Sequence, residues 1–238
     1  MRIASVQCFP LADDAAAACA QIVDRLHWAA QAGVDLILFP EAFLLGHSYD
    51  GEVIRARAAR ASDTALPQLC REVAAFPTTL VVGAFELVDG AMLNSALVIE
   101  GGRIAGRYAK AHPNEPGVTA GQAFPTFQRS ERRYGINICN DANHPEAAAR
   151  LAAQGADLIL YPLNNVLRPE TAERWRTKSL ENLIARARQT GCWVVSSDVA
   201  GKSGDRLSYG CTALVAPDGT VVARMPEMQC GAILHDLP

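Results

Sequence analysis

The segments GVDLILFPEAF (33–43) and GADLILYPLNN (155–165) decide the fold of this chain of 238 residues. They share Gly, Asp, Leu, Ile, Leu and Pro in register. Their apolar runs are nearly continuous, which is typical of strands covered on both faces. Two interpretations are open. Buried strands draw on the same few residue types, or the chain contains two related halves, each a helix layer on a strand layer, stacked sheet to sheet.

Helical and extended patterns alternate along the chain, which predicts an α/β fold. Four helices are predicted, over residues 13–33, 51–76, 144–154 and 169–190. The predicted strands are short and apolar, and they cover residues 3–8, 34–39, 79–85, 92–100, 103–108, 134–139, 156–161, 192–197, 211–216, 221–224 and 230–237. No linker or low-complexity segment divides the chain. We therefore expect residues 1–238 to form a single domain, a four-layer αββα sandwich in the second interpretation.

Local signals refine this picture in the first half of the chain. The dipeptides Asp89-Gly90 and Gly101-Gly102 predict tight hairpins, so the strands that they join should be antiparallel. The helical pattern over 51–76 has one expected break, near Asp63.

Composition excludes several classes of protein. Half of the residues are hydrophobic, the formal net charge is −3 and no basic block occurs, so a nucleic-acid partner is not expected. The longest apolar runs are too short to span a bilayer, and the N-terminus enters a strand pattern without a signal-peptide segment. The seven cysteines are scattered without a CxxC pair. These features predict a cytoplasmic protein without a membrane partner.

Reactive side chains follow several of the predicted strands. Glu41 comes directly after a buried strand and a proline, Lys110 ends another strand, and Cys139 ends a third. Each has a simpler interpretation: a helix-capping carboxylate, a solvated lysine and a packed thiol. A nucleophilic thiol needs a base, and a partly desolvated carboxylate such as Glu41 is a stronger proton acceptor. If the halves stack, Asn164 and Asn165 would face the same cleft as Glu41.

Histidine offers an alternative base. A Cys–His pair with His112 or His47 remains open, although neither lies in a local signature for one. A metal site is less well supported, because His112 and Glu115 share a loop without further ligands at telling spacing.

Together, an ordered Glu, Lys and Cys at strand ends form a specific pattern. The chain resembles the nitrilase superfamily of carbon–nitrogen hydrolases, which uses a Glu–Lys–Cys triad. The resemblance rests on FPE (39–41), YAKAH (108–112), GINICND (135–141) and HPE (144–146). Flanking segments also agree: VVGAFE (81–86) with Asn94, RARQTGCWVVSSDVAG (186–201) and YGCTALVAPDGTVVA (209–223). The similarity therefore covers nearly the whole chain, and the αββα fold of the family matches the two halves.

The resemblance implies roles for particular residues. Glu41 would be the general acid and base, Cys139 the nucleophile, and Lys110 with the Asn140 N–H the stabiliser of the developing oxyanion. Glu115 matches the family's second glutamate, although the segment between it and Lys110 is short for the family. The substrate-binding residues implied are Glu115, Asn140, Asn164 and Asn165. No metal or organic cofactor is implied.

The substrate class follows less directly. The favoured activity is hydrolysis of a small amide through a cysteine thioester. An N-carbamoyl amino acid amidohydrolase is an alternative, but Ala142 and Asn143 stand where those enzymes usually carry arginine, which Arg168 would have to replace. A nitrilase is another, although Asn140 stands where tryptophan is usual. A non-catalytic binding or assembly protein on this scaffold is the competing class. Family members commonly assemble, so a homodimer or larger homo-oligomer is expected.

Overall fold

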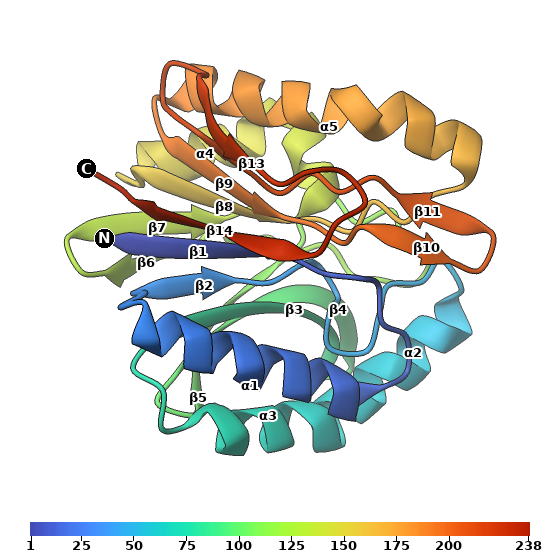
Figure 1. The fold of residues 1–238 in the computed structure, drawn as a ribbon. Coiled ribbons are helices and arrows are strands. Elements are labelled where there is room, and N and C mark those ends of the chain that lie inside the picture. The colour runs from blue at the N-terminus through green and yellow to red at the C-terminus, as the bar shows by residue number, and fades with distance from the viewer.

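The first of two sheets is built mainly from the N-terminal half. The computed structural model describes residues 1–238, arranged as helix, sheet, sheet and helix layers (Figure 1). The first sheet has the order β14-β1-β2-β3-β4-β5. Its strands are β1 (Arg2–Gln7), β2 (Leu36–Leu38), β3 (Thr79–Val88), β4 (Ala91–Glu100), β5 (Arg103–Ala109) and β14 (Gly231–Asp236). The C-terminal strand β14 pairs antiparallel with β1, so both ends of the chain lie side by side.

The second sheet repeats this plan with the order β13-β12-β9-β8-β7-β6. Its strands are β6 (Thr126–Arg129), β7 (Arg132–Ile136), β8 (Leu158–Pro162), β9 (Trp193–Ser197), β12 (Ala213–Val215) and β13 (Val221–Arg224). A separate hairpin is formed by β10 (Gly201–Ser203) and β11 (Arg206–Ser208). In each sheet one short strand is parallel to both neighbours: β2 to β1 and β3, and β8 to β7 and β9.

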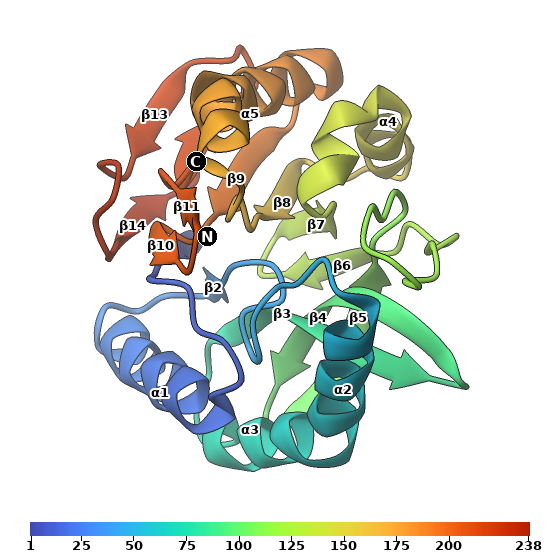
Figure 2. The same ribbon diagram turned by 90° about the vertical axis from the view of Figure 1, so that its right-hand side faces the viewer.

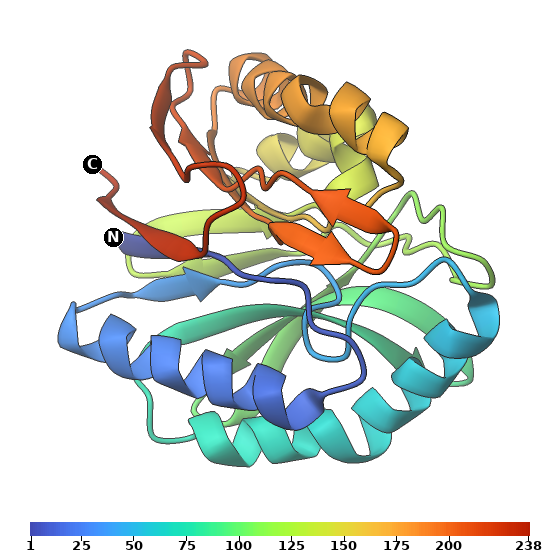
Figure 3. The ribbon, with the colours of Figure 1, turned by 45° about the vertical axis from the view of Figure 1, so that its right-hand side comes forward.

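Helices cover the outer face of each sheet (Figures 1 and 3). The first sheet carries α1 (Ala15–Gln31), α2 (Gly51–Arg60) and α3 (Leu66–Val73), with the π-helical turn η1 (Ala61–Ala65) between the last two. The second carries α4 (Pro145–Ala153) and α5 (Pro169–Thr190), and a 3₁₀ turn, η2 (Cys139–Asn143), precedes α4. No helix combines the length and apolar character needed to cross a membrane.

The two similar segments, 33–43 and 155–165, contain β2 and β8, and these strands bury corresponding side chains in the same core. Leu36 and Leu38 of β2 belong to the core between the sheets, whereas Ile37 faces the core under α1 and α3. In β8, Leu158 and Leu160 likewise enter the core between the sheets. This alternation is the period of two of a strand with both faces buried. The four-layer αββα sandwich is thus confirmed.

The two halves meet where β2 and β8 end. The backbone N–H of Glu41, beyond β2, donates to the carbonyl of Leu163, beyond β8, at 3.1 Å. Figure 2, turned by 90°, shows the loop after β2 lying between the helices of the first half and the second sheet. The fold therefore brings the polar residues after these strands to one place.

Local predictions are largely confirmed. Both predicted hairpins form, and their central residues have positive φ: Asp89 +50°, Gly90 +80°, Gly101 +53° and Gly102 +73°. The break predicted near Asp63 does not occur; the helix continues from α2 into α3 through the π-helical turn η1, which contains Asp63.

Three further predictions of local structure were wrong. Cys139 does not end a strand: β7 stops at Ile136, because the chain must turn into η2. Several strands are shorter than their apolar runs; ahead of β2, for example, the N–H of Val34 donates to the carbonyl of Ala29 in α1 and not to a neighbouring strand. The strands β6, β10 and β11 were missed, because their polar, exposed residues carry no apolar pattern.

Candidate active site

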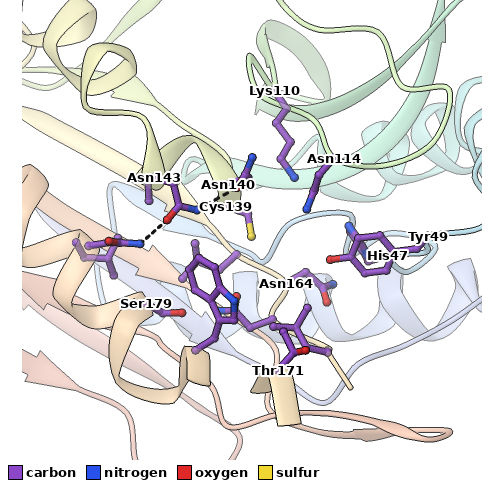
Figure 4. Close-up of a pocket in the computed structure, with 17 residues that line it drawn as sticks. His47, Tyr49, Lys110, Asn114, Cys139, Asn140, Asn143, Asn164, Thr171 and Ser179 are labelled. Atoms are coloured by element: carbon purple, nitrogen blue, oxygen red, sulfur yellow. Dashed lines mark hydrogen bonds between the residues drawn. The ribbon is translucent and has the colours of Figure 1, made fainter. Parts of the chain in front are cut away.

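Cys139 is held by a strained turn. Beyond β7, the N–H of Asn137 still donates to the carbonyl of Leu160 at 3.0 Å. Cys139 then adopts a φ of +42° and begins η2. A non-glycine residue in this region costs about 1–3 kcal/mol, and such residues cluster at functional sites. The turn places Cys139, a partly exposed residue, in the lining of a cavity of about 270 Å³ that has 17 lining residues (Figure 4).

Asp141 fixes this turn from behind. Its fully buried carboxylate accepts hydrogen bonds from the Ile138 N–H at 2.9 Å and the Tyr108 hydroxyl at 2.8 Å. Its other oxygen accepts from the backbone N–H of His112 at 2.9 Å and lies 2.9 Å from His112 Nδ1. One side chain therefore joins the residue before Cys139 to the segment that follows Lys110.

Glu41 is positioned by the loop after β2. Its neighbour Ala42 has a φ of +48°, and the loop packs on Gly83 of β3 so closely that a Cβ there would lie 2.3 Å from Ala42 N. The side chain of Asn164, after β8, donates to the Glu41 carbonyl at 3.0 Å. Glu41 is thus held from both halves of the molecule.

Lys110 follows β5 and is buried between two carboxylates. Its Nζ lies 2.7 Å from Oε1 of Glu41 and 2.7 Å from Oε1 of Glu115, with 1% of its side chain exposed. Burial lowers the pKa of Lys110, but the charges of Glu41, Cys139 and Glu115 outweigh it and leave the pKa raised. The ammonium is therefore a fixed positive charge beside the thiol.

Glu115 lies behind Lys110 and does not line the cavity. Its Oε1 accepts from Lys110, from Asn94 Nδ2 at 2.9 Å and lies 2.9 Å from His47 Nε2. Burial raises the pKa of Glu115, but the bonds from His47 and Lys110 outweigh burial and leave the pKa lowered. The structure therefore gives Glu115 a place that positions the lysine, despite the short intervening segment.

The carboxylate of Glu41 keeps one oxygen free. Its Oε1 is occupied by Lys110 and by Asn94 Nδ2, at 2.8 Å, while Oε2 is buried without a hydrogen-bond partner. Burial and the charge of Glu41 raise the pKa of Cys139 well above its usual value, and Lys110 opposes them. The raised pKa favours a protonated resting thiol, and the Glu41 carboxylate, which does not itself line the cavity, keeps one oxygen free to accept a proton.

The predicted substrate-binding asparagines have different surroundings. Asn140, Asn164 and Asn165 all line the cavity. The side chain of Asn140 is occupied, since it donates to the His112 carbonyl and accepts from Asn143. Asn165 is held by the buried Asp198, which accepts from its Nδ2 at 2.7 Å and its backbone N–H at 3.1 Å. Asn164 keeps a buried, unpartnered Oδ1.

The alternative residues lie elsewhere. Arg168 is exposed at the start of α5 and does not line the cavity. His112 is taken up by Asp141. His47 does line the cavity, but its Nε2 is bonded to Glu115. Neither histidine forms a hydrogen bond with Cys139, so the Cys–His arrangement has no geometric support.

Two groups of side chains bring possible metal ligands within 4.8 Å of one another: Glu41 with His47 and Glu115, and His112 with His144 and Glu146. In the first group the Lys110 ammonium already lies between the carboxylates. In the second the imidazole rings are stacked, with centroids 3.6 Å apart and planes 1° from parallel. Nitrogen lone pairs lie in the ring plane, so these two rings cannot converge on one ion as they stand.

One wall of the cavity was not foreseen. The helix α5 contributes Thr171, Trp175, Ser179 and Asn182, spaced by three or four residues along one face. Tyr49 lines the opposite side (Figure 4). The spacing was readable in the sequence, but nothing there said that this face meets the site.

Sequence comparison identifies the family. Residues 2–238 match the family model described as carbon-nitrogen hydrolase. The chain belongs to this family and is a nitrilase-superfamily carbon–nitrogen hydrolase. It is 29% identical over 209 residues to the deaminated glutathione amidase of Escherichia coli O157:H7, covering 84% of this chain and 77% of that protein. It is 26% identical over 213 residues to the glutamine-dependent NAD(+) synthetase of Rhodobacter capsulatus; that match spans 87% of this chain but 38% of the relative's length.

Solved structures show the same fold. An amidase from Nesterenkonia sp. superposes with a TM-score of 0.89 at 24% identity, covering 100% of this chain and 90% of that one. Another structure of that amidase shows covalent addition of the acetamide moiety of fluoroacetamide at its active-site cysteine.

Proposed function

We propose that this chain hydrolyses a small amide with Cys139 as nucleophile, Glu41 as general acid and base, and Lys110 as a stabiliser of negative charge. The observation that carries the proposal is that Lys110, which lines the cavity together with Cys139, lies 2.7 Å from Glu41, whose buried Oε2 has no hydrogen-bond partner. The products are a carboxylic acid and ammonia or an amine. The amidase names of relatives agree with this reaction.

The first half of the reaction acylates the cysteine. Glu41 Oε2 takes the thiol proton as Cys139 Sγ attacks the carbonyl carbon of the amide, whose oxygen becomes an oxyanion. Lys110 and the backbone N–H of Asn140, in the first turn of η2, stabilise this oxyanion. The intermediate collapses, Glu41 returns its proton to the leaving nitrogen, and a thioester remains.

The second half regenerates the enzyme. Glu41 takes a proton from a water molecule as the water oxygen attacks the carbonyl carbon of the thioester. Lys110 and the backbone N–H of Asn140 stabilise this second oxyanion as well. Collapse expels the Cys139 thiolate, which recovers the proton from Glu41. Proton transfer by one well-placed carboxylate therefore serves both halves.

Asn164 is suited to orient the amide nitrogen. Its Nδ2 is committed to the Glu41 carbonyl, so Oδ1 is an acceptor with no other partner. An amide N–H of the substrate would satisfy this buried oxygen, which otherwise loses the free energy of a hydrogen bond. We propose a structural role for the side chain of Asn165, because Asp198 holds it.

Two observations favour an amide over the alternatives on the same triad. A carbamoyl amino acid carries a carboxylate, and Arg168, the arginine considered for it, lies outside the cavity. A nitrilase usually carries tryptophan after the nucleophile, whereas this chain carries Asn140, whose side chain is engaged with His112 and Asn143. This difference disfavours a nitrile substrate. A purely binding role does not explain why Glu41 and Lys110 are buried beside the one cysteine in the cavity.

The test is ammonia release from a panel of aliphatic amides, ω-amides, N-carbamoyl amino acids and nitriles. We expect turnover of amides by the wild-type protein and none by Cys139→Ala. The matched control is Cys230→Ala, which removes an exposed thiol away from the cavity and should leave turnover unchanged. Turnover restricted to nitriles or carbamoyl compounds would replace the amidase assignment, and full activity in Cys139→Ala would overturn the mechanism.

We also propose that residues 1–238 act as a single domain in the cytoplasm and assemble as a homodimer or larger homo-oligomer. All seven cysteines are free thiols, which suits a reducing compartment. Exposed apolar side chains on the edge strand β13, Val221 and Val222, are available for assembly. Sedimentation that detects only monomer would remove the assembly proposal.

A further inference from the structure

Neutral amides line the cavity from the residue next to Cys139 to the helix α5. Asn182 Nδ2 donates to Asn143 Oδ1 at 2.9 Å, and Asn143 Nδ2 donates to Asn140 Oδ1 at 3.0 Å. Asn140 Nδ2 in turn donates to the carbonyl of His112 at 2.9 Å. Figure 4 shows the bonds at Asn143 as dashed lines. We call Asn140, Asn143 and Asn182 the amide chain.

The backbone carbonyl at one end sets the direction of the whole chain. A carbonyl can only accept, so Asn140 must turn its NH₂ toward His112 and its oxygen toward Asn143. Because Asn140 presents its oxygen, Asn143 must donate to it through Nδ2, and Asn182 must in turn donate to the oxygen of Asn143. The Oδ1 of Asn182 is therefore turned away from Asn143, and no hydrogen bond within the chain uses it. Ser179, three residues earlier on α5, adds a hydroxyl to the same lining.

Charge in and around the cavity disfavours an anion. None of the 17 lining residues is Asp, Glu or Arg, and Lys110 is the only lysine. Its ammonium is already bonded to Glu41 and Glu115, and His47, which also lines the cavity, is bonded to Glu115. With the imidazole of His47 neutral, two carboxylates face one ammonium and the formal charge is −1. A carboxylate carried into the cavity by a substrate would be desolvated, unpaired and repelled.

Two cations lie beside the cavity without lining it. The Arg206 guanidinium is 5.2 Å from the centroid of the Tyr49 ring, and Lys178 Nζ is 4.8 Å from the centroid of the Trp175 ring. Both rings line the cavity, so each cation is in contact with a lining side chain and is not itself among the residues that face the cavity.

We propose that the substrate is an uncharged amide whose acyl chain ends in a neutral hydrogen-bonding group, such as a second carboxamide or a hydroxyl, and that Asn182 and Ser179 bind this end. The inference rests on the proposed amidase function and deepens it. Leu163, Leu167 and Trp175 line the cavity as well and suit a short methylene chain. A cavity of about 270 Å³ lies just below the usual range for ligand sites, which fits a small substrate.

Three isosteric amides test the proposal on the wild-type protein. Glutaramide ends in a carboxamide, glutaramate in a carboxylate, and a branched amide carries an isopropyl group in the same place. Shorter and longer homologues of all three cover the unknown chain length. At the best length we expect the kcat/KM of the diamide, corrected for its two equivalent amides, to exceed that of each isostere by roughly tenfold or more.

A pair of variants assigns the effect to the amide chain. Asn182→Leu removes the polar end at nearly constant volume, so the ratio of the diamide's kcat/KM to that of the isopropyl amide should fall by roughly tenfold. Gln189→Leu makes the same change on α5 outside the cavity and should preserve the ratio. The wild-type comparison stands even if Asn182→Leu does not fold.

Each outcome has a distinct meaning. Equal or better turnover of glutaramate overturns the inference of an uncharged substrate but leaves the amidase function intact. Arg206 would then be the first candidate for binding the carboxylate. Preference for the isopropyl amide overturns the role of Asn182 and Ser179. Failure of every amide, with no acyl group on Cys139, overturns the proposed function itself.

Discussion

At the scale of single residues, the site depends on side chains that never touch a substrate. Asp141 accepts four hydrogen bonds and so connects the turn at Cys139 with the segment after Lys110. Every group facing its oxygens is a donor or, at His112 Nδ1, can be one. A buried carboxylate with this many donors fixes positions more firmly than a packed apolar residue.

Asp141→Asn tests this positioning role. The new NH₂ would face donors, so we expect a loss of about 1–3 kcal/mol in the free energy of unfolding. The kcat should fall more than KM changes, because the displaced groups act on the transition state. Asp63→Asn, at an exposed position, is the control. An unchanged kcat in a folded Asp141→Asn protein would contradict the role.

Glu41→Gln tests the proposed base. Glutamine can still accept from Lys110 and Asn94 through its oxygen, so the fold should persist, but it cannot take the thiol proton. We expect kcat/KM for amide hydrolysis to fall by about 10²–10⁴-fold, measured by ammonia release. Glu86→Gln is the control, since Glu86 is also buried and paired with Arg107 at 3.1 Å, on β3 away from the cavity. Comparable losses in both variants would mean that Glu41 has only a structural part.

The sequence could predict the triad positions but not their supporting contacts. Glu41, Lys110 and Cys139 each stand beside a readable strand pattern. His47 and Asp141 carry no such signal, because their roles arise from loops that meet only in three dimensions. The unpartnered Oδ1 of Asn164 likewise depends on where the Glu41 carbonyl lies.

At the scale of elements, the close contact between β3 and the loop after β2 places the carboxylate of Glu41, our proposed base. Gly83 donates to the Pro40 carbonyl at 3.2 Å and its own carbonyl accepts from Leu44 at 3.2 Å. A Cβ on Gly83 would lie 2.7 Å from the Glu41 carbonyl carbon, a distance that side chains do not tolerate. Glycine is therefore required here by space, with no demand for a positive φ.

Gly83→Ala should displace the loop that carries Glu41. We expect both the free energy of unfolding and the kcat to fall, since small displacements of catalytic groups are costly. The control is Gly51→Ala at the start of α2, where the added Cβ meets its neighbours at 3.5 Å or more. Thermal unfolding and ammonia release measure the two effects. Wild-type activity in Gly83→Ala would show that the loop adapts without moving Glu41.

Buried strands were easier to predict from the sequence than exposed ones. The twin strands β2 and β8 are apolar throughout, and the Asp89-Gly90 and Gly101-Gly102 turns have strong local preferences. By contrast, β10 and β11 are stabilised by tertiary pairing, including a bridge from Leu207 to Leu167, which no local pattern reports.

At the scale of the whole molecule, the site lies where the two halves meet, and its charges couple to folding. Glu115 titrates well below its usual pKa in the folded protein because Lys110 and His47 hold it ionised against the effect of burial. A lowered pKa in the folded state gives stability that is complete above the unfolded value and is lost as pH falls.

The free energy of unfolding should therefore depend on pH through Glu115. Its usual pKa is 4.5, so the wild-type protein should lose stability relative to Glu115→Gln as the pH falls below about 4.5. Urea unfolding of both proteins between about pH 7 and pH 3 measures the difference. A difference that stays constant across this range would mean that Glu115 is not held ionised by its neighbours.

The arrangement of the halves was predictable because GVDLILFP and GADLILYP are similar, which indicates an equivalent buried strand in each half. The far wall of the cavity was not, since α5 follows β8 and returns over the site only through the tertiary packing of the second half. We propose that substrate selectivity resides on that wall, in Asn182 and Ser179, so the sequence could indicate a reaction class before a substrate.

The most direct measurement is intact-protein mass spectrometry within the first turnovers on a cleaved amide. If Cys139 is the nucleophile, we expect a mass increase equal to the acyl group, located on Cys139 by peptide mapping. This increase should disappear as acid is released and should never form in Cys139→Ala. Steady turnover with no acyl group at Cys139 under rapid acid quenching, or an acyl group on any other residue, would contradict nucleophilic catalysis by Cys139.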